Sequence, residues 1–166
     1  TAQPDVNGLI FYRPTRGMIS DHFDAEKKHF GTDIAANPNE SVLATLDGTV
    51  ILSTYTAETG YLIEVQHNQD FVSVYKHCGS LLKREGDTVK GGEAIALVGN
   101  SGTLTTGPHL HFECRFMGID INPTQIIDFA NGSPLRDIYT FRRGATSRAA
   151  SSYASARPAK NGYKKS

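Results

Sequence analysis

The sequence predicts an all-β protein built from antiparallel strands, arranged as a sandwich or an open barrel. Short strand-like segments fill residues 9–117, and glycine-rich turns separate them. This succession of short strands and turns is typical of antiparallel sheets. No convincing amphipathic helix of useful length precedes residues 123–129, which are expected to form one short turn.

The expected strands follow one another from turn to turn along the chain. Alternating polar and apolar residues favour a strand at 109–117, and the β-branched Thr32 and Ile34 favour one over 29–36. The other expected strands are a run at 9–12 ended by Pro14, a segment at 42–54 interrupted at Asp47-Gly48, a hairpin of 60–66 and 71–77, and a segment at 94–98. His67 sits in the turn of that hairpin and is expected to be exposed rather than to bind a metal.

A pair of histidines lies two residues apart in the stretch GPHLHFE at 107–113. Residues two apart on a strand share a face, so His109 and His111 project together while Leu110 and Phe112 point to the other side. Such a pair is weak evidence alone, because many histidines of this kind are surface residues of a strand.

A second stretch, HFGTD, places His29 and Asp33 four residues apart on one face of the expected strand. Gly31 between them has no side chain and is expected to leave room for a metal ion. Together the two stretches offer two imidazoles and one carboxylate, a ligand set that suits a catalytic zinc ion with one position open for water. His109 and His77 are then left over for acid–base work, since the pKa of histidine lies near neutral pH.

Further motifs accompany these two stretches in a fixed order. The full series is GMIS (17–20), HFGTDIA (29–35), VLA (42–44), DGTV (47–50), YKH (75–77), GDTVKGG (86–92), VGNSG (98–102), TGPHLHFE (106–113) and NP (122–123). This series resembles the catalytic domain of lysostaphin-type zinc metalloendopeptidases, from about Gly17 to Ile127. All the motifs in this order are highly specific, although each one alone is modest.

The resemblance implies a site and a substrate. It implies that His29, Asp33 and His111 bind Zn²⁺, and that His77 and His109 are catalytic. It also implies an active-site groove on one sheet face, peptidoglycan peptides as substrate, cleavage of their bridges or cross-links, and a place in the bacterial cell envelope. We assign His109 as the general base and His77 to orienting water or stabilising the oxyanion, but the sequence does not separate these two roles.

Some positions depart from the family pattern. Cys78 follows His77 where the family often has an apolar residue, and Phe23 beside His22 stands where some members have a tyrosine. If the hydroxyl of that tyrosine stabilises the transition state in those family members, this chain must do without it or use His22 instead. Degenerate members of the family have lost ligands and activate other wall hydrolases, so a non-catalytic wall-binding or activating module is the alternative reading.

Several other residues have a structural reading that competes with a functional one. Glu113 shares the face of His111 and is a possible acceptor for its ring, but a solvated glutamate is the expected case. Cys78 and Cys114 are expected to face the core, with a disulfide less favoured. The segment around Lys90 resembles the hairpin of biotinyl or lipoyl carrier domains, and we interpret it as a shared scaffold rather than a carrier site.

The charge of the chain is unevenly distributed. The formal net charge is zero, yet residues 131–166 hold eight Lys and Arg residues against one acid, a balance of +7 that leaves −7 for residues 1–130. We expect an N-terminal extension at 1–16, a catalytic domain at 17–130 and a flexible basic tail at 131–166. The tail could bind anionic wall polymers, lipid head groups or nucleic acid, but a solvated terminus without a partner is the expected case. Nothing in it resembles a nucleic-acid-binding motif, so no nucleic-acid partner is expected. We expect a monomer, and a segment before Thr1 could supply an export signal or membrane anchor.

Overall fold

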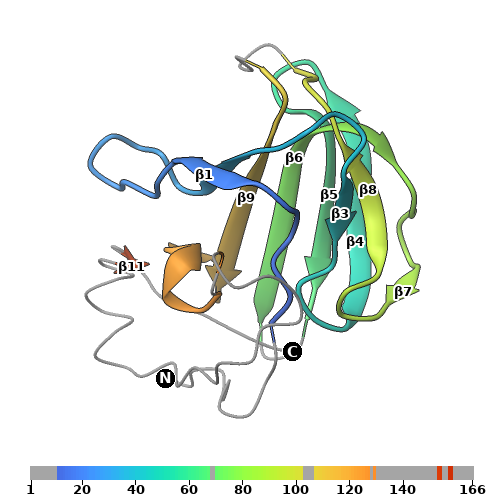
Figure 1. Cartoon of the computed structure of the whole chain (residues 1–166). Helices are drawn as coiled ribbons and strands as arrows, with labels where there is room; N and C mark the ends of the chain where they lie inside the picture. The colour runs from blue at the N-terminus through green and yellow to red at the C-terminus, as the bar shows by residue number, and fades with distance from the viewer. Residues whose placement is uncertain are drawn as a thin grey trace.

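The computed structural model describes residues 11–67, 70–102, 107–127 and 129, and the backbone of two short strands at 153–154 and 157–158. Within this described part, ten strands form one open sheet (Figure 1). The prediction of an all-β, antiparallel fold is confirmed. No helix of the described residues has the length and apolar character needed to cross a membrane.

The elements follow the turn signals of the sequence closely. The strands of the sheet are β1 (Met18–Asp21), β2 (Thr32–Ala35), β3 (Ser41–Leu43), β4 (Gly48–Thr56), β5 (Gly60–Gln66), β6 (Phe71–Leu81), β7 (Thr88–Val89), β8 (Ala94–Val98), β9 (His109–Phe116) and β10 (Ile119–Ile121). A 3-10 turn, η1 (Pro123–Gln125), comes next, and β11 (Tyr153–Ala154) pairs with β12 (Arg157–Pro158).

The order of strands brings distant parts of the chain together. It runs β1-β2-β9-β6-β5-β4-β7, with β10 beside β9, and with β8 between β6 and β3. All of these pairings are antiparallel. Consequently β2 lies directly against β9, although the two strands are far apart in sequence.

Strand β6 changes its partner at His77. Up to Lys76 it pairs with β9, and from Cys78 it pairs with β8. His77 lies between the two pairings with φ of 64°. Positive φ is uncommon for a residue other than glycine and clusters at functional positions. Because the backbone of β6 is irregular at His77, the direction of the His77 side chain does not have to follow the alternation of side chains along the strand.

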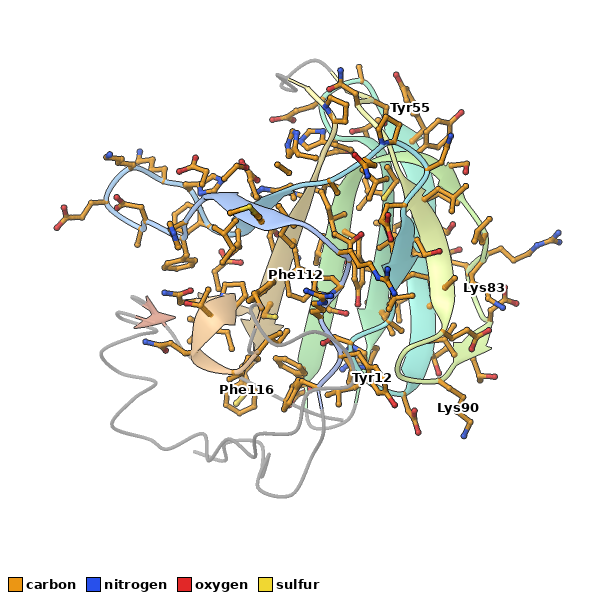
Figure 2. All side chains as sticks on the ribbon, in the orientation of Figure 1. Tyr12, Tyr55, Lys83, Lys90, Phe112 and Phe116 are labelled. Atoms are coloured by element: carbon orange, nitrogen blue, oxygen red, sulfur yellow. The ribbon has the colours of Figure 1, made fainter. Side chains whose placement is uncertain are left out.

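One cluster of buried side chains fills the space between β3 and β8 and the sheet formed by β4, β5, β6 and β9. Its members include Val42, Val50, Ile63, Val65, Tyr75, Ile95, Val98, Leu110 and Phe112. Leu110 and Phe112 are fully buried, as the alternation around His109 and His111 predicted. Figure 2 shows Phe112 inside the molecule and Lys90 on its surface.

The two cysteines are buried thiols of the same core rather than a disulfide. Burial raises the pKa of the Cys78 thiol to about 12, so it stays protonated at neutral pH. The prediction that Cys78 and Cys114 act as small core residues is confirmed.

The strand expected over 29–36 is shorter than predicted. Strand β2 begins at Thr32, because its pairing with β9 starts there. His29 instead closes a tight loop, with two backbone hydrogen bonds of 2.8 and 2.9 Å joining it to Asp24. Part of the expected run at 9–12 lies outside the described residues, and Phe11 and Tyr12 belong to no strand.

The prediction that His67 is exposed is wrong. Its side chain is buried, and its Nδ1 donates to the Asp47 carbonyl oxygen at 2.7 Å. Its Nε2 is hydrogen-bonded to Ser73 Oγ at 2.8 Å, and Ser73 continues the chain to the Tyr75 hydroxyl. The turn signal located the residue correctly, but the partner groups come from the bend before β4 and from β6, and sequence patterning does not place these beside His67.

Replacing His67 with leucine is expected to destabilise the fold by about 1–3 kcal/mol, because the Asp47 carbonyl oxygen loses its bond to the ring and the buried Ser73 hydroxyl keeps only Tyr75 as partner. Denaturant unfolding of the two proteins measures this difference. A variant as stable as the parent would show that the buried chain of hydrogen bonds contributes nothing net.

The expected domain boundaries at 16 and 131 stay predictions. Residues 1–10 and most of the tail lie outside the described residues, and so does the expected flexibility of that tail. Within the expected extension, Phe11 is buried in the core and its ring packs against Phe71. Thr15 also donates a hydrogen bond to the Ser41 carbonyl oxygen.

Candidate metal centre

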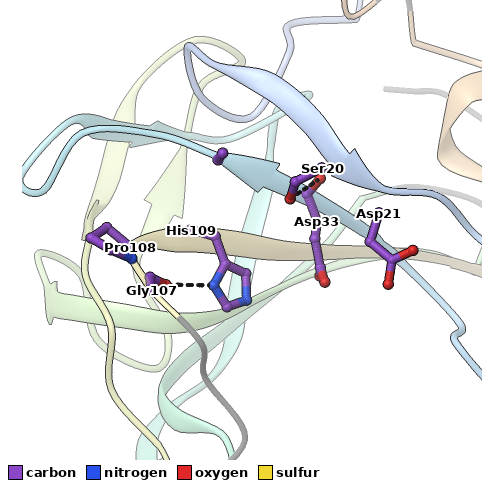
Figure 3. A pocket seen from close by; sticks show the side chains of 7 residues that line it. Ser20, Asp21, Asp33, Gly107, Pro108 and His109 are labelled. Carbon is purple, nitrogen blue, oxygen red and sulfur yellow. Dashed lines mark hydrogen bonds between the residues drawn. The ribbon is translucent and has the colours of Figure 1, made fainter.

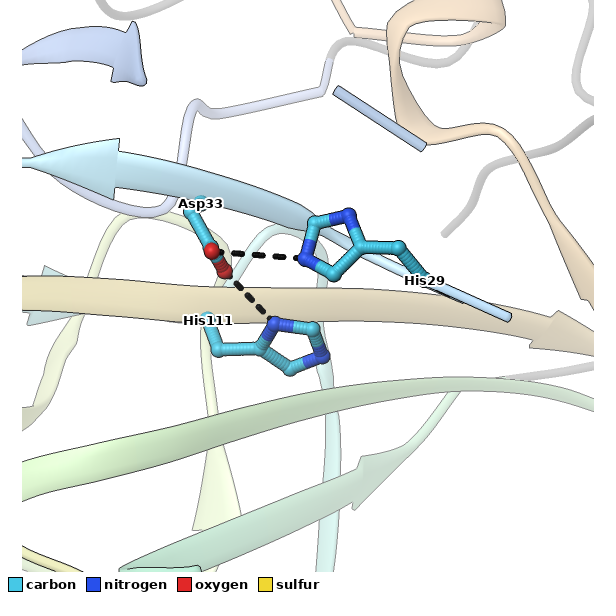
Figure 4. A group of neighbouring side chains, drawn as sticks. All are labelled: His29, Asp33 and His111. Carbon is cyan, nitrogen blue, oxygen red and sulfur yellow. Dashed lines mark hydrogen bonds and ion pairs between the residues drawn. The ribbon is translucent and has the colours of Figure 1, made fainter. Parts of the chain in front are cut away.

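The pairing of β2 with β9 builds the centre of the site. Asp33 lies directly opposite His111 in the register of the two strands. Side chains at directly opposed positions of neighbouring strands lie close together on one face. The Asp33 Oδ1 and His111 Nδ1 atoms are 2.7 Å apart, so residues 78 positions apart in sequence touch (Figure 4).

His29 reaches the same carboxylate from the loop before β2. Its Nδ1 donates a hydrogen bond of 2.8 Å to the backbone oxygen of His22. That bond places the proton on Nδ1 and leaves a lone pair on Nε2. The Nε2 atom is buried without a hydrogen-bond partner among the described residues, and it faces Asp33 Oδ2 at 3.3 Å.

His111 is held in a similar way from its other side. Its Nε2 donates to Glu113 Oε2 at 2.8 Å, which leaves Nδ1 as the atom turned to Asp33. Both histidines therefore commit one ring nitrogen to an oxygen acceptor and aim the other at the same carboxylate.

The charges within this cluster favour the binding of a cation, because they keep the Asp33 carboxylate ionised. Burial would by itself raise the pKa of Asp33, but the hydrogen bond to His111 and the nearby ring of His29 hold it well below its usual value. Burial would lower the pKa of His111, but hydrogen bonds to Asp33 and Glu113 raise it to about 9. The protein therefore holds an ionised carboxylate against a proton on His111 Nδ1, a proton that metal binding would displace.

The residues fit a zinc ion on these grounds. One donor atom each from His29, Asp33 and His111 lies within 4.8 Å of the other two. Two imidazoles and one carboxylate form the ligand set of many catalytic zinc sites, and each ring has the outer acceptor that such ligands usually need.

The two remaining histidines stand beside this cluster. The rings of His77 and His109 have centroids 5.2 Å apart, and the centroid of His77 is 6.2 Å from that of His111. Their Nδ1 atoms donate to the backbone oxygens of Ser101 and Gly107, each at 2.8 Å. Each ring is thus held with the proton on Nδ1 and a lone pair on Nε2.

The pKa of His77 is lowered, first by burial and then by the neighbouring histidines His109 and His111. Burial opposes the charged imidazolium because it removes the water that would solvate it. His77 is therefore neutral at pH 7, and its Nε2 can accept a proton there.

A cleft opens beside His109 and Asp33 (Figure 3). Its volume is about 400 Å³, and its lining residues are Ser20, Asp21, Asp33, Ala35, Gly107, Pro108 and His109. The expected groove on one sheet face thus has a counterpart here. Ser20 and Asp21 were not among the predicted site residues, and the GMIS motif around Ser20 was the signal that could have pointed to them.

The prediction of a solvated Glu113 is wrong. Its side chain is buried and contacts Lys76 Nζ at 3.0 Å and Arg115 Nη2 at 2.7 Å in addition to His111. Burial would raise its pKa, but the hydrogen bond from His111 and the charges of Arg115 and Lys76 hold it well below the usual value. Pairing with two cations explains how a carboxylate can be buried here.

Gly31 makes room, but for protein atoms rather than for a metal ion. A Cβ atom at this position would meet His111 Nε2 at 2.7 Å and Glu113 Cγ at 2.8 Å. The expectation that Gly31 leaves space for an ion is therefore wrong, because the hydrogen-bonded pair of His111 and Glu113 fills that space.

His22 contributes its backbone to the site, through the bond to His29, and its side chain is exposed. The neighbouring Phe23 packs against Phe30 and the core. The role suggested for the His22 side chain stays a prediction.

Comparison with known proteins agrees with this architecture. The model of Peptidase family M23 matches residues 27–123, more than half of the chain. The chain belongs to peptidase family M23, which confirms the family resemblance of the motifs.

Individual relatives carry different names. The murein hydrolase activator NlpD of Escherichia coli strain K12 is 39% identical over 117 residues, which cover 69% of this chain and 30% of NlpD. The peptidoglycan DD-endopeptidase ShyC of Vibrio cholerae is 35% identical over 100 residues, 60% of this chain and 23% of ShyC. The chain thus spans less than a third of these relatives.

A solved structure, a zinc-containing peptidase from Vibrio cholerae, superposes with a TM-score of 0.65 at 32% identity and covers 68% of this chain and 39% of that one. The relatives are proteins of the bacterial cell envelope, and the predicted envelope location is confirmed.

Proposed function

We propose that this chain is a zinc-dependent endopeptidase that hydrolyses peptide cross-links or bridges of bacterial peptidoglycan. One observation carries the proposal: His29 Nε2, His111 Nδ1 and the Asp33 carboxylate converge, while the rings of His77 and His109 stand beside them. The names of the Vibrio cholerae relatives, a zinc-containing peptidase and a peptidoglycan endopeptidase, support it.

His29, Asp33 and His111 would hold the zinc ion. When bound, zinc polarises a carbonyl oxygen and lowers the pKa of a coordinated water towards neutrality. The bonds from His29 to the His22 backbone and from His111 to Glu113 keep both rings in the tautomer that can bind.

We assign the proton transfers to the other two histidines. His109 Nε2 lies beside the cleft with its lone pair free, so it can take a proton from the attacking water and return it to the leaving amine. His77 Nε2 can orient that water by accepting a hydrogen bond from it. If His77 rather than His109 takes the proton of the water, its Nε2–H can donate a hydrogen bond to the developing oxyanion.

The alternative is a non-catalytic module that binds the wall or activates another hydrolase. It is favoured by the name of NlpD, a murein hydrolase activator. Against it, all five expected site residues are present and converge in this chain.

Digestion of purified peptidoglycan tests the proposal. Zinc-loaded protein is expected to release fragments with new amino ends, seen by mass spectrometry, and a chelator is expected to stop this release. If zinc-loaded protein released no peptide ends but stimulated a wall hydrolase in the same assay, the endopeptidase would be excluded and the alternative adopted.

A further inference from the structure

Glu113 contacts a residue of the metal centre, His111, but is not one of the three candidate ligands. Its carboxylate Oε2 accepts a hydrogen bond of 2.8 Å from His111 Nε2, on the side of the ring away from Asp33. The side chain is 7% exposed, so no surrounding solvent competes for the His111 proton.

Two cations hold this carboxylate in place. Lys76 Nζ is 3.0 Å from Oε2, and Arg115 Nη2 is 2.7 Å from Oε1. Arg115 is itself fixed by two further acids, with Nε 3.2 Å from Asp120 Oδ1 and Nη1 3.9 Å from Glu64 Oε2. Because Lys76 of the neighbouring strand β6 contacts one oxygen of Glu113 and Arg115 of the same strand contacts the other, the orientation of Glu113 toward His111 is fixed.

Gly31, in the loop just before β2, lies against the same contact. The space above the hydrogen bond between His111 and Glu113 is closed, since any Cβ atom at Gly31 would lie within 2.8 Å of both side chains. The glycine of the HFGTD stretch therefore allows the two side chains to lie beneath the chain that carries His29 and Asp33.

A neutral imidazole carries one proton, and the acceptor it meets decides on which nitrogen. With Glu113 accepting at Nε2, the neutral ring of His111 has its lone pair on Nδ1, once metal binding displaces the proton that Nδ1 shares with Asp33. Without that acceptor, the ring could carry its proton on either nitrogen and could turn about its χ angles.

We propose that Glu113 is a positioning residue that fixes His111 in the Nε2–H tautomer, so that Nδ1 is presented to the zinc ion. This inference rests on the proposed function, because it assumes that the cluster binds zinc. Lys76 and Arg115 act through Glu113 by holding its two oxygens in the orientation that faces His111.

Zinc affinity of the full chain, measured by competition with a chromophoric chelator, tests this role. Glu113→Leu removes the acceptor and is expected to weaken zinc binding by about 10–100-fold, the usual effect of losing an outer partner. Glu113→Gln keeps an oxygen acceptor and is expected to recover most of that loss. Glu93→Gln is the matched control: it removes an acid paired with Lys83, outside the group of residues that holds Glu113 and His111, and affinity is expected to be unchanged.

A second measurement needs no variant. In zinc-loaded protein with ¹⁵N-labelled histidine, His111 is expected to show a proton on Nε2 that exchanges slowly with water. This measurement remains available if Glu113→Leu does not fold. A Glu113 that only stabilised the fold through its ion pairs would not fix the proton of His111 on Nε2.

The outcomes separate the two proposals. A parent protein that binds no zinc would overturn the proposed function. If the parent binds zinc, then equal affinity in all variants, an equal loss in Glu113→Gln and Glu113→Leu, or a His111 Nε2 without a proton would each overturn the role of Glu113 alone.

Discussion

Replacing His111 with alanine is expected to abolish zinc retention and peptidoglycan hydrolysis together. The substitution removes one of three converging ligand atoms, and it leaves the Asp33 and Glu113 carboxylates without the ring that joins them. The loss of affinity is expected to exceed the roughly 10–100-fold effect of an outer partner. Metal analysis after gel filtration and release of new amino ends measure both effects.

Folding has to be separated from metal binding in this variant. The parent protein stripped of zinc is the reference, and the secondary structure of the His111→Ala protein is compared with it by circular dichroism. A folded His111→Ala protein that still retained zinc and turned over normally would remove His111 from the ligand set.

Replacing His109 with alanine is expected to keep zinc but lower turnover by about 10²–10⁴-fold, the usual contribution of a general acid–base residue. The ring of His109 bonds only to the Gly107 backbone oxygen in the described structure, so its removal leaves the three ligand atoms in place. Turnover and zinc content of the same preparation measure the two effects.

His77→Ala provides the comparison between the two catalytic candidates, and Lys90→Met is the control. Lys90 is 83% exposed on its side chain and projects from the surface in Figure 2, so its loss is expected to change neither zinc content nor turnover. Normal turnover in His109→Ala would show that this histidine is not the base, and a fall in His77→Ala alone would transfer the role to His77.

Local patterning predicted the faces of the strands well. The spacing of His109 and His111 places both rings on one side of β9, and Leu110 and Phe112 enter the core on the other side. This inference depends only on the two-residue repeat of a strand, which adjacent residues determine by themselves. For the same reason the hairpin of β5 and β6 was found where predicted, although β6 continues past the predicted end at His77 to Leu81.

Predictions about environment failed where the surroundings come from distant segments. Glu113 was expected in solvent because a lone glutamate usually is, yet Lys76 of β6 buries and pairs it. His67 was expected to be exposed because it follows a turn, yet Ser73 and the Asp47 backbone enclose it. Burial depends on which strands become neighbours, and that information is not local.

The amino-acid sequence alone determined the β class, the family and the five residues proposed for the site, because strand periodicity and the order of motifs are properties of the chain itself. Tertiary structure decided which atoms meet. The pairing of β2 with β9 placed Asp33 directly opposite His111, and the sheet placed the Glu113 carboxylate within hydrogen-bond distance of His111. At His77, where β6 changes partner, the backbone takes a positive φ and leaves the regular strand geometry. These outcomes depend on strand register and on the partners available to each ring nitrogen, which exist only once the sheet has formed.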